Sequence, residues 1–576
     1  MSLVRTYVRL KRTISWSDFL IILALLAFIY GIVHFAQEWS GEIKPVVKIS
    51  LSPWALPEYT FYSLIRGFVA YGISLIFTLV YGYVAAYNKR AEKVMVPLLD
   101  ILQSIPVLGF LPGLVIALIT LFPHSNIGLE LAAVLMIFTG QAWNMTFSFY
   151  RSIQSIPNEL REVSKIYRFN WWQRFTKLEL PYSIMGLVWN SMMSMAGGWF
   201  FLSISEAFVL GDKDFRLPGI GSYMSVAIQT GNLPAMIYAI IAMSLMIIAV
   251  DQLFWKPIVA WAQKFKFEDT EAAQVPTSKL LDLLQSSHAL LFLRKSVLYP
   301  IYRFMLKVFS YFSGKRNYRK SENQSHILTS SLMWLFRTLL FGLVAYSVYK
   351  LFLLLGSVDL KEWIMILTDL LLTFLRVFVA VAIGSLWTIP AGVAIGMNPK
   401  LSKIFQPIIQ VVASFPAPML FPIVLLILMK IGGSIEYGSI LLMMLGTQWY
   451  ILFNVIAGAM AIPSDLREVA RINRLTKFQY YKRLILPAIF PFLVTGWVTA
   501  SGGAWNASIV AEYVHFGSNI LTATGLGSKI TLATDSGNFG VLAASIIAMS
   551  TTVVFVNRMF WKRLYKLAEE RFSLSK

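Results

Sequence analysis

Long apolar runs constrain this chain more than any other feature of its sequence. Stretches of about 20 or more mostly apolar residues recur along its 576 positions, and 57% of all residues are hydrophobic while only 14% are charged. A backbone segment surrounded by hydrocarbon has no water to bond, so each run must satisfy its own hydrogen bonds, which a single segment achieves as a helix. The chain is therefore predicted to be an all-α integral membrane protein.

Twelve apolar runs are candidate membrane spans, in two groups of six. The predicted spans are 18–36, 60–87, 95–122, 128–150, 181–209 and 233–255, then 329–355, 364–397, 404–430, 436–459, 487–513 and 538–560. A basic, mixed stretch separates the groups. This organisation predicts a first half at residues 1–256, a linker at 257–328 and a second half at 329–576. The linker is expected to be cytoplasmic and partly laid along the membrane surface.

The net charge of +21 comes from short basic clusters between apolar runs, such as Lys89-Arg90 and Lys315-Arg316. Nucleic-acid binding is disfavoured, because these clusters have no soluble fold to sit on. Their placement follows the positive-inside rule and predicts a multi-pass membrane protein with both termini in the cytoplasm. The lipid bilayer is thus the first expected partner.

The two halves repeat one another. Ile156–Val163 aligns with Ile462–Val469 at a shift of 306 residues, and the same shift carries Trp199 onto Trp505 and Glu206 onto Glu512. Earlier in each half the shift is 310, as from Arg66 to Arg376, so a small length difference falls between spans three and four. Both halves have the same topology, which predicts parallel six-helix repeats around a pseudo-twofold translocation path.

A cytoplasmic loop between spans four and five carries the strongest local signal. It covers residues 152–181 and again 458–487, and each copy predicts an amphipathic helix capped by Asn158 or Ser464, with acidic residues near its start. The small residues Ser164 and Ala470 would permit a partner surface to approach closely. The alternative is a helix lying on the bilayer whose acids only complement its dipole.

This loop resembles the EAA loop of ABC importer permeases, in which the sequence E-A-A is followed after three residues by Gly and then by I-x-L-P. The glutamate, the small third residue and the final Leu-Pro match in both copies, whereas the second residue is Val and the Gly is replaced by Arg168 and Arg474. The resemblance implies that the loops couple the permease to ATPases. The implied coupling residues are Arg161, Glu162, Val163, Ser164, Arg168, Arg467, Glu468, Val469, Ala470 and Arg474.

Each half of the chain, over nearly its whole length, resembles one permease of the nitrate, sulfonate, taurine and bicarbonate branch of binding-protein-dependent permeases. The resemblance implies a type I importer fold, two cytoplasmic ABC ATPase subunits and an extracytoplasmic solute-binding protein. It also implies transport of a small oxyanion or organic acid. A twelve-span secondary transporter is the alternative for this topology, and a membrane-embedded enzyme is disfavoured because the spans contain few acidic residues.

Polar side chains and prolines inside the spans are candidates for the translocation path, because buried polar groups are costly in lipid. They are Arg66, Ser104, Pro106, Pro112, Gln141, Asn144, Trp199 and Glu206 in the first half, and Arg376, Ser414, Pro416, Pro422, Gln448, Trp505, Asn506 and Glu512 in the second. The alternatives are interfacial anchoring for Trp, helix-to-helix hydrogen bonding for Asn and Gln, and for each Arg either snorkelling toward the outer surface or pairing with the Glu of its own half.

No catalytic residue, metal site or bound cofactor is expected in this chain. Histidines number five and cysteines are absent. No Walker-type phosphate loop occurs, and Gly525–Lys529 is interpreted as a short turn. ATP and magnesium are therefore expected on the partner ATPase subunits.

Overall fold

The computed structural model describes residues 47–210, 213–265, 326–516 and 519–572, with a few isolated positions before residue 40 and between 295 and 304. Most of the predicted span 18–36 and of the linker 257–328 lies outside the described residues. The chain forms two compact units. The smaller unit comprises residues 1–38, 151–189 and 249–324, and the larger unit comprises 39–150, 190–248 and 325–576.

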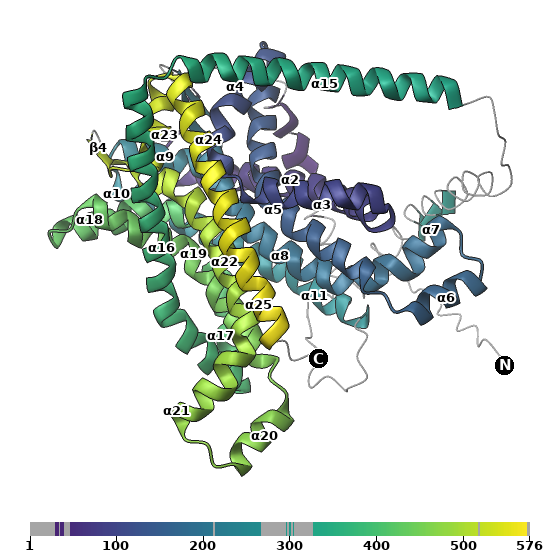
Figure 1. Ribbon diagram of the computed structural model, residues 1–576. Coiled ribbons are helices and arrows are strands. Elements are labelled where there is room, and N and C mark those ends of the chain that lie inside the picture. The colour runs from purple at the N-terminus through teal and green to yellow at the C-terminus, as the bar shows by residue number, and fades with distance from the viewer. Residues whose placement is uncertain are drawn as a thin grey trace. The chain divides into compact units, whose positions relative to one another are not determined.

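Helices dominate the described residues of both halves (Figure 1). The first half contains η1 (Pro53–Ala55), α2 (Leu56–Tyr87), α3 (Lys89–Ser104), η2 (Val107–Phe110), α4 (Leu111–Leu121), α5 (Ile127–Gln154), α6 (Asn158–Ile166), α7 (Trp171–Arg174), η3 (Phe175–Glu179), α8 (Leu180–Ser205), β1 (Ala207–Leu210), β2 (Lys213–Arg216), α9 (Ile220–Gln229), α10 (Leu233–Val250), η4 (Asp251–Trp255), α11 (Lys256–Ala262) and η5 (Gln263–Phe265).

The second half repeats this order from its second span onward. It contains α15 (His326–Gly356), α16 (Leu360–Met397), α17 (Pro399–Ser414), η7 (Ala417–Leu420), α18 (Phe421–Lys430), α19 (Ile435–Met460), α20 (Ser464–Ile472), α21 (Lys477–Tyr480), η8 (Tyr481–Ile485), α22 (Leu486–Ala511), β3 (Tyr513–Phe516), β4 (Asn519–Thr522), α23 (Leu526–Asp535), α24 (Phe539–Val556), η9 (Asn557–Trp561) and α25 (Lys562–Phe572).

Within the described residues, seven helical segments are long and apolar enough to cross a membrane, or nine when each of two bent pairs counts as one span. The all-α membrane fold is therefore confirmed. Helix α8, the predicted span 181–209, is not among the seven, although its counterpart in the second half is. The small and polar residues along α8, including Asn190 and several serines, lower its hydropathy.

The third span of each half is sharply bent. Helix α3 meets the segment Val107–Leu121 at 88°, and α17 meets Ala417–Lys430 at 80°. Pro106 and Pro416 stand at the two bends in extended backbone, and both prolines are buried. Proline lacks the N–H that would continue the helix, so the interruption expected from these residues appears as a corner.

The fifth spans end earlier than predicted. The predicted spans 181–209 and 487–513 continue past the true ends of α8 and α22, at Ser205 and Ala511. Each is followed by an antiparallel hairpin, β1 with β2 and β3 with β4. The apolar strand residues resemble a helix continuation in composition, and only pairing with the second strand distinguishes them.

The interpretation of Gly525–Lys529 as a short turn was also wrong. Leu526 begins helix α23, and Gly525 precedes it as the N-cap. In the first half α9 begins at Ile220, directly after Gly219. Each half thus inserts a hairpin and a ten-residue helix between its fifth and sixth spans, an arrangement that hydropathy alone did not predict.

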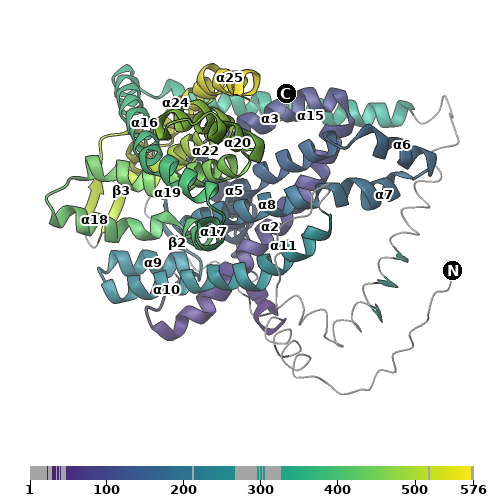
Figure 2. The same ribbon diagram turned by 90° about the horizontal axis from the view of Figure 1, so that it is seen from below.

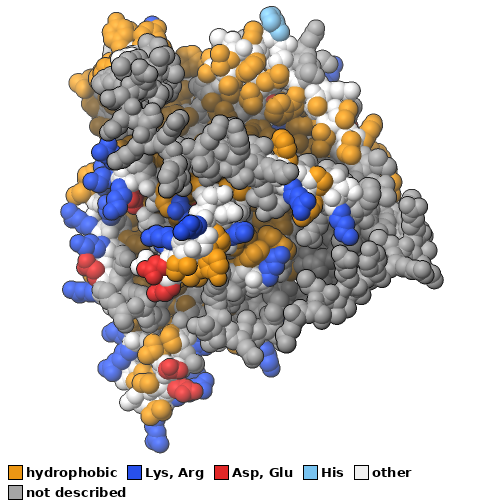
Figure 3. Space-filling view, turned by 90° about the vertical axis from the view of Figure 1, so that its right-hand side faces the viewer, with side chains coloured by type: hydrophobic (Ala, Val, Ile, Leu, Met, Phe, Trp, Pro, Cys, Tyr) orange, Lys and Arg blue, Asp and Glu red, His pale blue; other side chains and the backbone are white. Residues whose placement is uncertain are grey.

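Helices of the second half form a compact bundle in the larger unit, where α19 packs against both α16 and α22 (Figures 1 and 2). Ile451, Val455 and Ile489 are fully buried in its core. On the face in Figure 3, hydrophobic side chains and the side chains of Lys and Arg both reach the surface.

Candidate functional site: a repeated ion network, an interface cavity and two loop helices

A fully buried ion network joins three helical segments of the first half within the larger unit. Arg66 of α2 contacts Glu130 of α5 at 2.6 Å and Glu206, just after α8, at 2.7 Å, and all three side chains are at most 1% exposed. The Arg66 guanidinium also donates to the Pro218 carbonyl at 2.8 Å, and Ser63 donates to Glu206 at 2.6 Å. The network fixes the segment that leads into α9 against α2 and α5.

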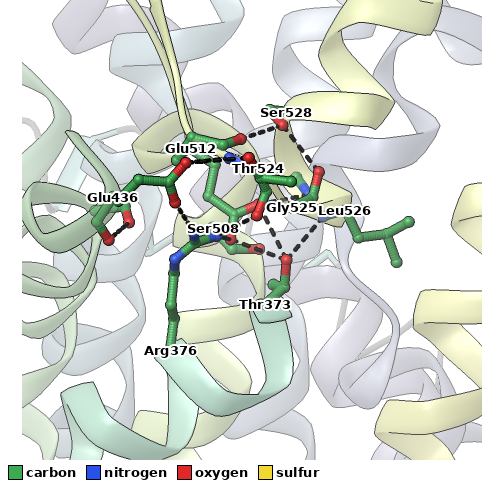
Figure 4. A network of polar contacts seen from close by, with 12 residues as sticks. Thr373, Arg376, Glu436, Ser508, Glu512, Thr524, Gly525, Leu526 and Ser528 are labelled. Atoms are coloured by element: carbon green, nitrogen blue, oxygen red, sulfur yellow. Dashed lines mark hydrogen bonds and ion pairs between the residues drawn. The ribbon is translucent and has the colours of Figure 1, made fainter. Parts of the chain in front are cut away.

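The second half contains the same network in a more open form (Figure 4). Arg376 contacts Glu512 at 3.0 Å and is also paired with Glu436, whose side chain is 42% exposed. Thr373 takes the place of Ser63 and donates to Glu512, and the Thr524 carbonyl takes the place of that of Pro218. Equivalent residues therefore make equivalent contacts, but only in the second half is one of the carboxylates partly exposed.

Glycines make room for the two buried carboxylates. A Cβ atom built on Gly219 would lie 2.4 Å from the Glu206 carboxyl, and one on Gly525 would lie 2.4 Å from that of Glu512. The N–H groups of Gly221 and Gly527 donate to the same carboxylates at 2.7 and 2.8 Å. Gly219 and Gly525 have extended φ angles of 174° and −176°, so the requirement here is space rather than left-handed backbone.

Sequence reasoning paired Arg66 with Glu206 and Arg376 with Glu512 as one alternative, and the structure contains both pairs. It missed Glu130 and Glu436. The signal was present, because the shift of 306 residues carries Glu130 onto Glu436. A repeated acidic residue near the start of a membrane helix, in a chain poor in acids, marks a partner for the repeated arginine.

A cavity of about 260 Å³ lies between the two halves, inside the larger unit. Pro112 and Pro422 line it together with other residues of both bent third spans, and α9, β3 and α23 complete its wall. Sequence reasoning missed its polar residues Tyr513, His515 and Asp535. Tyr513 donates to Asp535 at 2.6 Å, and burial, followed by this hydrogen bond, raises the pKa of Tyr513 above its ordinary value.

Other predicted path residues lie at helix contacts rather than in the cavity wall. The Gln141 amide is buried and reaches Ser74 and Met195, and Gln448 accepts from the Trp387 indole at 3.0 Å. Trp199 and Trp505 are at most 2% exposed. Asn144 accepts from Gln103 at 3.4 Å, and Ser414 donates to the carbonyl of Gln410 in its own helix. Ser104 closes α3.

One predicted path residue connects the halves directly. Asn506 of α22 accepts from the Val107 backbone N–H at 2.8 Å, at the bend of the other half's third span. Phe200 stands at the equivalent position of the first half, 306 residues earlier, and has no amide to offer. The broken third span of the first half is therefore tied to the second half by a bond that the repeat does not duplicate.

The EAA-like loop of the first half forms α6 in the smaller unit. Val163 and Ile166 are 45% and 76% exposed, and Glu162 is exposed beside them. Arg161 donates to the Ile153 carbonyl at 2.8 Å, which ties α6 to the end of α5. The helix thus presents apolar and acidic side chains outward from a fixed position.

The second loop has the same local geometry, in α20 of the larger unit. Val469 and Ile472 are 53% and 79% exposed, and Arg467 donates to the Ala459 carbonyl at 3.3 Å. Two expectations need correction. Ser164 and Ala470 are buried in the chain's own fold and do not lie on the presented face. The helices begin at Asn158 and Ser464, so the residues before them, Pro157 and Pro463, hold the N-cap positions without a side-chain cap.

Arg168 and Arg474, at the position where the EAA loop has glycine, adopt φ angles of 50° and 47°. Each donates its backbone N–H to the carbonyl three residues earlier, and the following residue bonds to the carbonyl five residues earlier. These bonds form the Schellman ending of a helix, whose left-handed residue is usually glycine. The backbone keeps the glycine conformation although the side chain is arginine.

Comparison with known proteins assigns both halves to the same family. Residues 78–254 and 388–564, together more than half of the chain, match the family described as "Binding-protein-dependent transport system inner membrane component". The chain is 27% identical over 184 residues to the nitrate import permease protein NrtB of Leptolyngbya laminosa, which is 32% of this chain and 62% of that protein.

Two further relatives carry other names. The chain is 30% identical over 142 residues to the bicarbonate transport system permease protein CmpB of Synechococcus elongatus (25% of this chain, 50% of that protein). It is 28% identical over 198 residues to the taurine transport system permease protein TauC of Escherichia coli (34% and 67%). The matches cover about half to two thirds of these relatives' lengths. With its two family matches, this chain belongs to the inner membrane components of binding-protein-dependent transport systems.

Proposed function

We propose that this chain is the permease of an ATP-driven importer for a small oxyanion or organic acid, with both halves of the permease in one chain. The observation that carries the proposal is the pair of loop helices α6 and α20. Each presents exposed apolar side chains beside an exposed glutamate, and each is anchored by an arginine to the end of the preceding span. A surface that occurs once in each half fits two copies of one kind of partner.

The partners that fit these helices are two cytoplasmic ATPase subunits, which would bind ATP and magnesium. Val163, Ile166 and their counterparts Val469 and Ile472 would enter an apolar groove, and Glu162 and Glu468 would meet basic or N–H groups at its edge. Arg161 and Arg467 act indirectly, because they hold the helices in position. A movement of the ATPases would then move the spans to which α6 and α20 are joined.

The translocation path in this proposal runs through the cavity between the halves, next to the bent third spans. A solute-binding protein would deliver the solute from the side opposite to the ATPases. In this proposal the protein lies in a bacterial inner membrane, and the basic loops support a cytoplasmic position of α6, α20 and both termini by the positive-inside rule. The substrates in the names of the relatives support the class of small oxyanions and organic acids.

The test reverses both loop charges in the full importer. The variant Glu162→Lys/Glu468→Lys should insert normally and keep the cavity, but should lose most uptake and most copurified ATPase. Glu570→Lys is the matched control, since Glu570 is 58% exposed on α25 and lies outside both loops. Unchanged ATP-dependent uptake in the double variant would contradict the proposal. Uptake that needs no ATPase at all would instead indicate a secondary transporter.

A further inference from the structure

The two walls of the cavity differ in polarity although they are built from equivalent elements. At the shift of 306 residues, Tyr513 corresponds to Ala207, Thr534 to Ile228 and Asp535 to Gln229, and all six residues line the cavity. The wall from β3 and α23 therefore carries a phenol, a hydroxyl and a carboxylate where the wall from β1 and α9 carries two alkyl groups and an amide. Only the second half offers a charged group to a solute.

The polar groups of the second wall are arranged around Asp535. Tyr513 donates to one carboxylate oxygen at 2.6 Å, and the His515 ring packs edge-on against Tyr513 at a centroid distance of 5.1 Å. On the first wall, Gln229 already accepts from the Arg216 guanidinium at 2.7 Å. Among the described residues that line the cavity there is no Lys or Arg.

This lining is unfavourable for a bare inorganic oxyanion. Such an ion would give up hydration on entering and would meet mostly hydrocarbon, a few neutral hydroxyl and amide groups, and a carboxylate of its own sign. A cationic group gains from the same carboxylate by a charge-assisted hydrogen bond. The remaining wall, with Leu108, Leu111 and Met419, suits an apolar body.

We propose that the cavity binds an amphipathic organic solute that carries an ammonium group, with the ammonium at Asp535 and the apolar body against the first-half wall. The inference rests on the proposed function and narrows its substrate class to organic solutes that carry an ammonium group. The volume of about 260 Å³ has room for a solute of several heavy atoms. Fusion of the halves permits this arrangement, because two identical subunits would present identical walls.

The test measures binding to the full chain in detergent, without ATPase, by the shift of its thermal unfolding midpoint with solute concentration. Two matched pairs serve as probes: 2-aminoethanesulfonate against propane-1-sulfonate, and 6-aminohexanoate against heptanoate, with nitrate as the bare oxyanion. In at least one pair the amine should bind about tenfold more tightly than its partner, as expected for one charge-assisted bond. Nitrate should bind more weakly than that amine.

Asp535→Gln copies the first-half residue onto the second wall and should abolish the amine preference. Asp535→Asn serves the same purpose should the longer side chain impair folding. Glu362→Gln is the control, because it removes a partly exposed carboxylate of the same half that pairs with Lys529 and does not line the cavity, and the preference should persist in it. The inference is overturned if neither pair shows an amine advantage, if the advantage survives both Asp535 variants, or if nitrate binds best. These outcomes are independent of ATPase coupling, so the charge-reversal test still decides the proposed function separately.

Discussion

The ion network of the first half is fully buried, whereas its copy in the second half is exposed at one carboxylate. Arg66, Glu130 and Glu206 are at most 1% exposed, but the Glu436 side chain is 42% exposed. Both copies connect the same elements through the same residue types. The duplication therefore preserved the ion pairs that hold the segments leading into α9 and α23, whereas the burial of these ion pairs diverged between the halves.

The largest expected effect separates these two networks. Arg66→Met leaves two carboxylates buried without their cation and should lower the free energy of unfolding by about 3–5 kcal/mol. Arg376→Met should cost less, about 1–3 kcal/mol, since Glu436 can be hydrated. Denaturant unfolding of the full chain in detergent measures the loss of unfolding free energy in each variant. Equal losses in the two variants would mean that the exposure of Glu436 does not affect how much its ion network contributes to stability.

The glycines beside the carboxylates test whether both halves need the same space. Gly219→Ala and Gly525→Ala each place a methyl group 2.4 Å from a buried carboxyl and should cost about 1–3 kcal/mol of unfolding free energy. Gly72→Ala and Gly502→Ala are controls in the same two halves, because no atom lies within 4 Å of the added Cβ. These controls should be neutral or slightly stabilising, as expected for alanine in a helix. A loss in the controls as large as in the test variants would remove the steric explanation.

A smaller effect distinguishes ionic from aromatic contacts at one repeated position. Lys529 of α23 lies 3.4 Å from Glu362 and 3.3 Å from Asp369, whereas its first-half equivalent Tyr223 packs against Tyr59 and donates to the Leu51 carbonyl at 2.9 Å. Lys529→Met should cost about 1 kcal/mol at low salt and less at high salt. Tyr223→Phe should cost a similar amount at every salt concentration. An equal salt dependence of the stability losses in Lys529→Met and Tyr223→Phe would contradict this distinction between an ionic and an uncharged contact.

The smallest effect concerns the left-handed residues that close the loop helices. Arg168→Gly and Arg474→Gly should relieve a backbone strain of about 1 kcal/mol each, and offsetting chain entropy should leave a net gain of a few tenths. Arg168→Ala and Arg474→Ala are the matched controls, because they remove the charge but keep the Cβ and the strain. Resistance of the loops to limited proteolysis is the sensitive measurement. A gain in the alanine variants as large as in the glycine variants would trace the effect to charge instead.

Repetition made part of the site predictable. Arg66, Arg376, Glu206 and Glu512 stand out because they recur at fixed shifts in a chain with few membrane acids. Glu130 and Glu436 recur in the same way and were overlooked because each begins a span, where an acid needs no special explanation. The cavity residues Tyr513 and Asp535 could not emerge from a search for repeats, since their first-half equivalents are Ala207 and Gln229.

The sequence by itself determined the membrane-helical fold, the duplication, the breaks in the third spans and the paired loops. Each of these features follows from a pattern visible in the sequence: the length of an apolar run, a proline within it, or a motif repeated at a constant shift. Only the tertiary structure decided where α8 and α22 stop and strands begin, that Arg168 and Arg474 take the glycine conformation, and that residues near 108, 229, 419 and 535 enclose one cavity. The cavity depends on contacts between segments hundreds of residues apart, and the hairpins and helix ends depend on backbone hydrogen bonds that hydropathy does not specify.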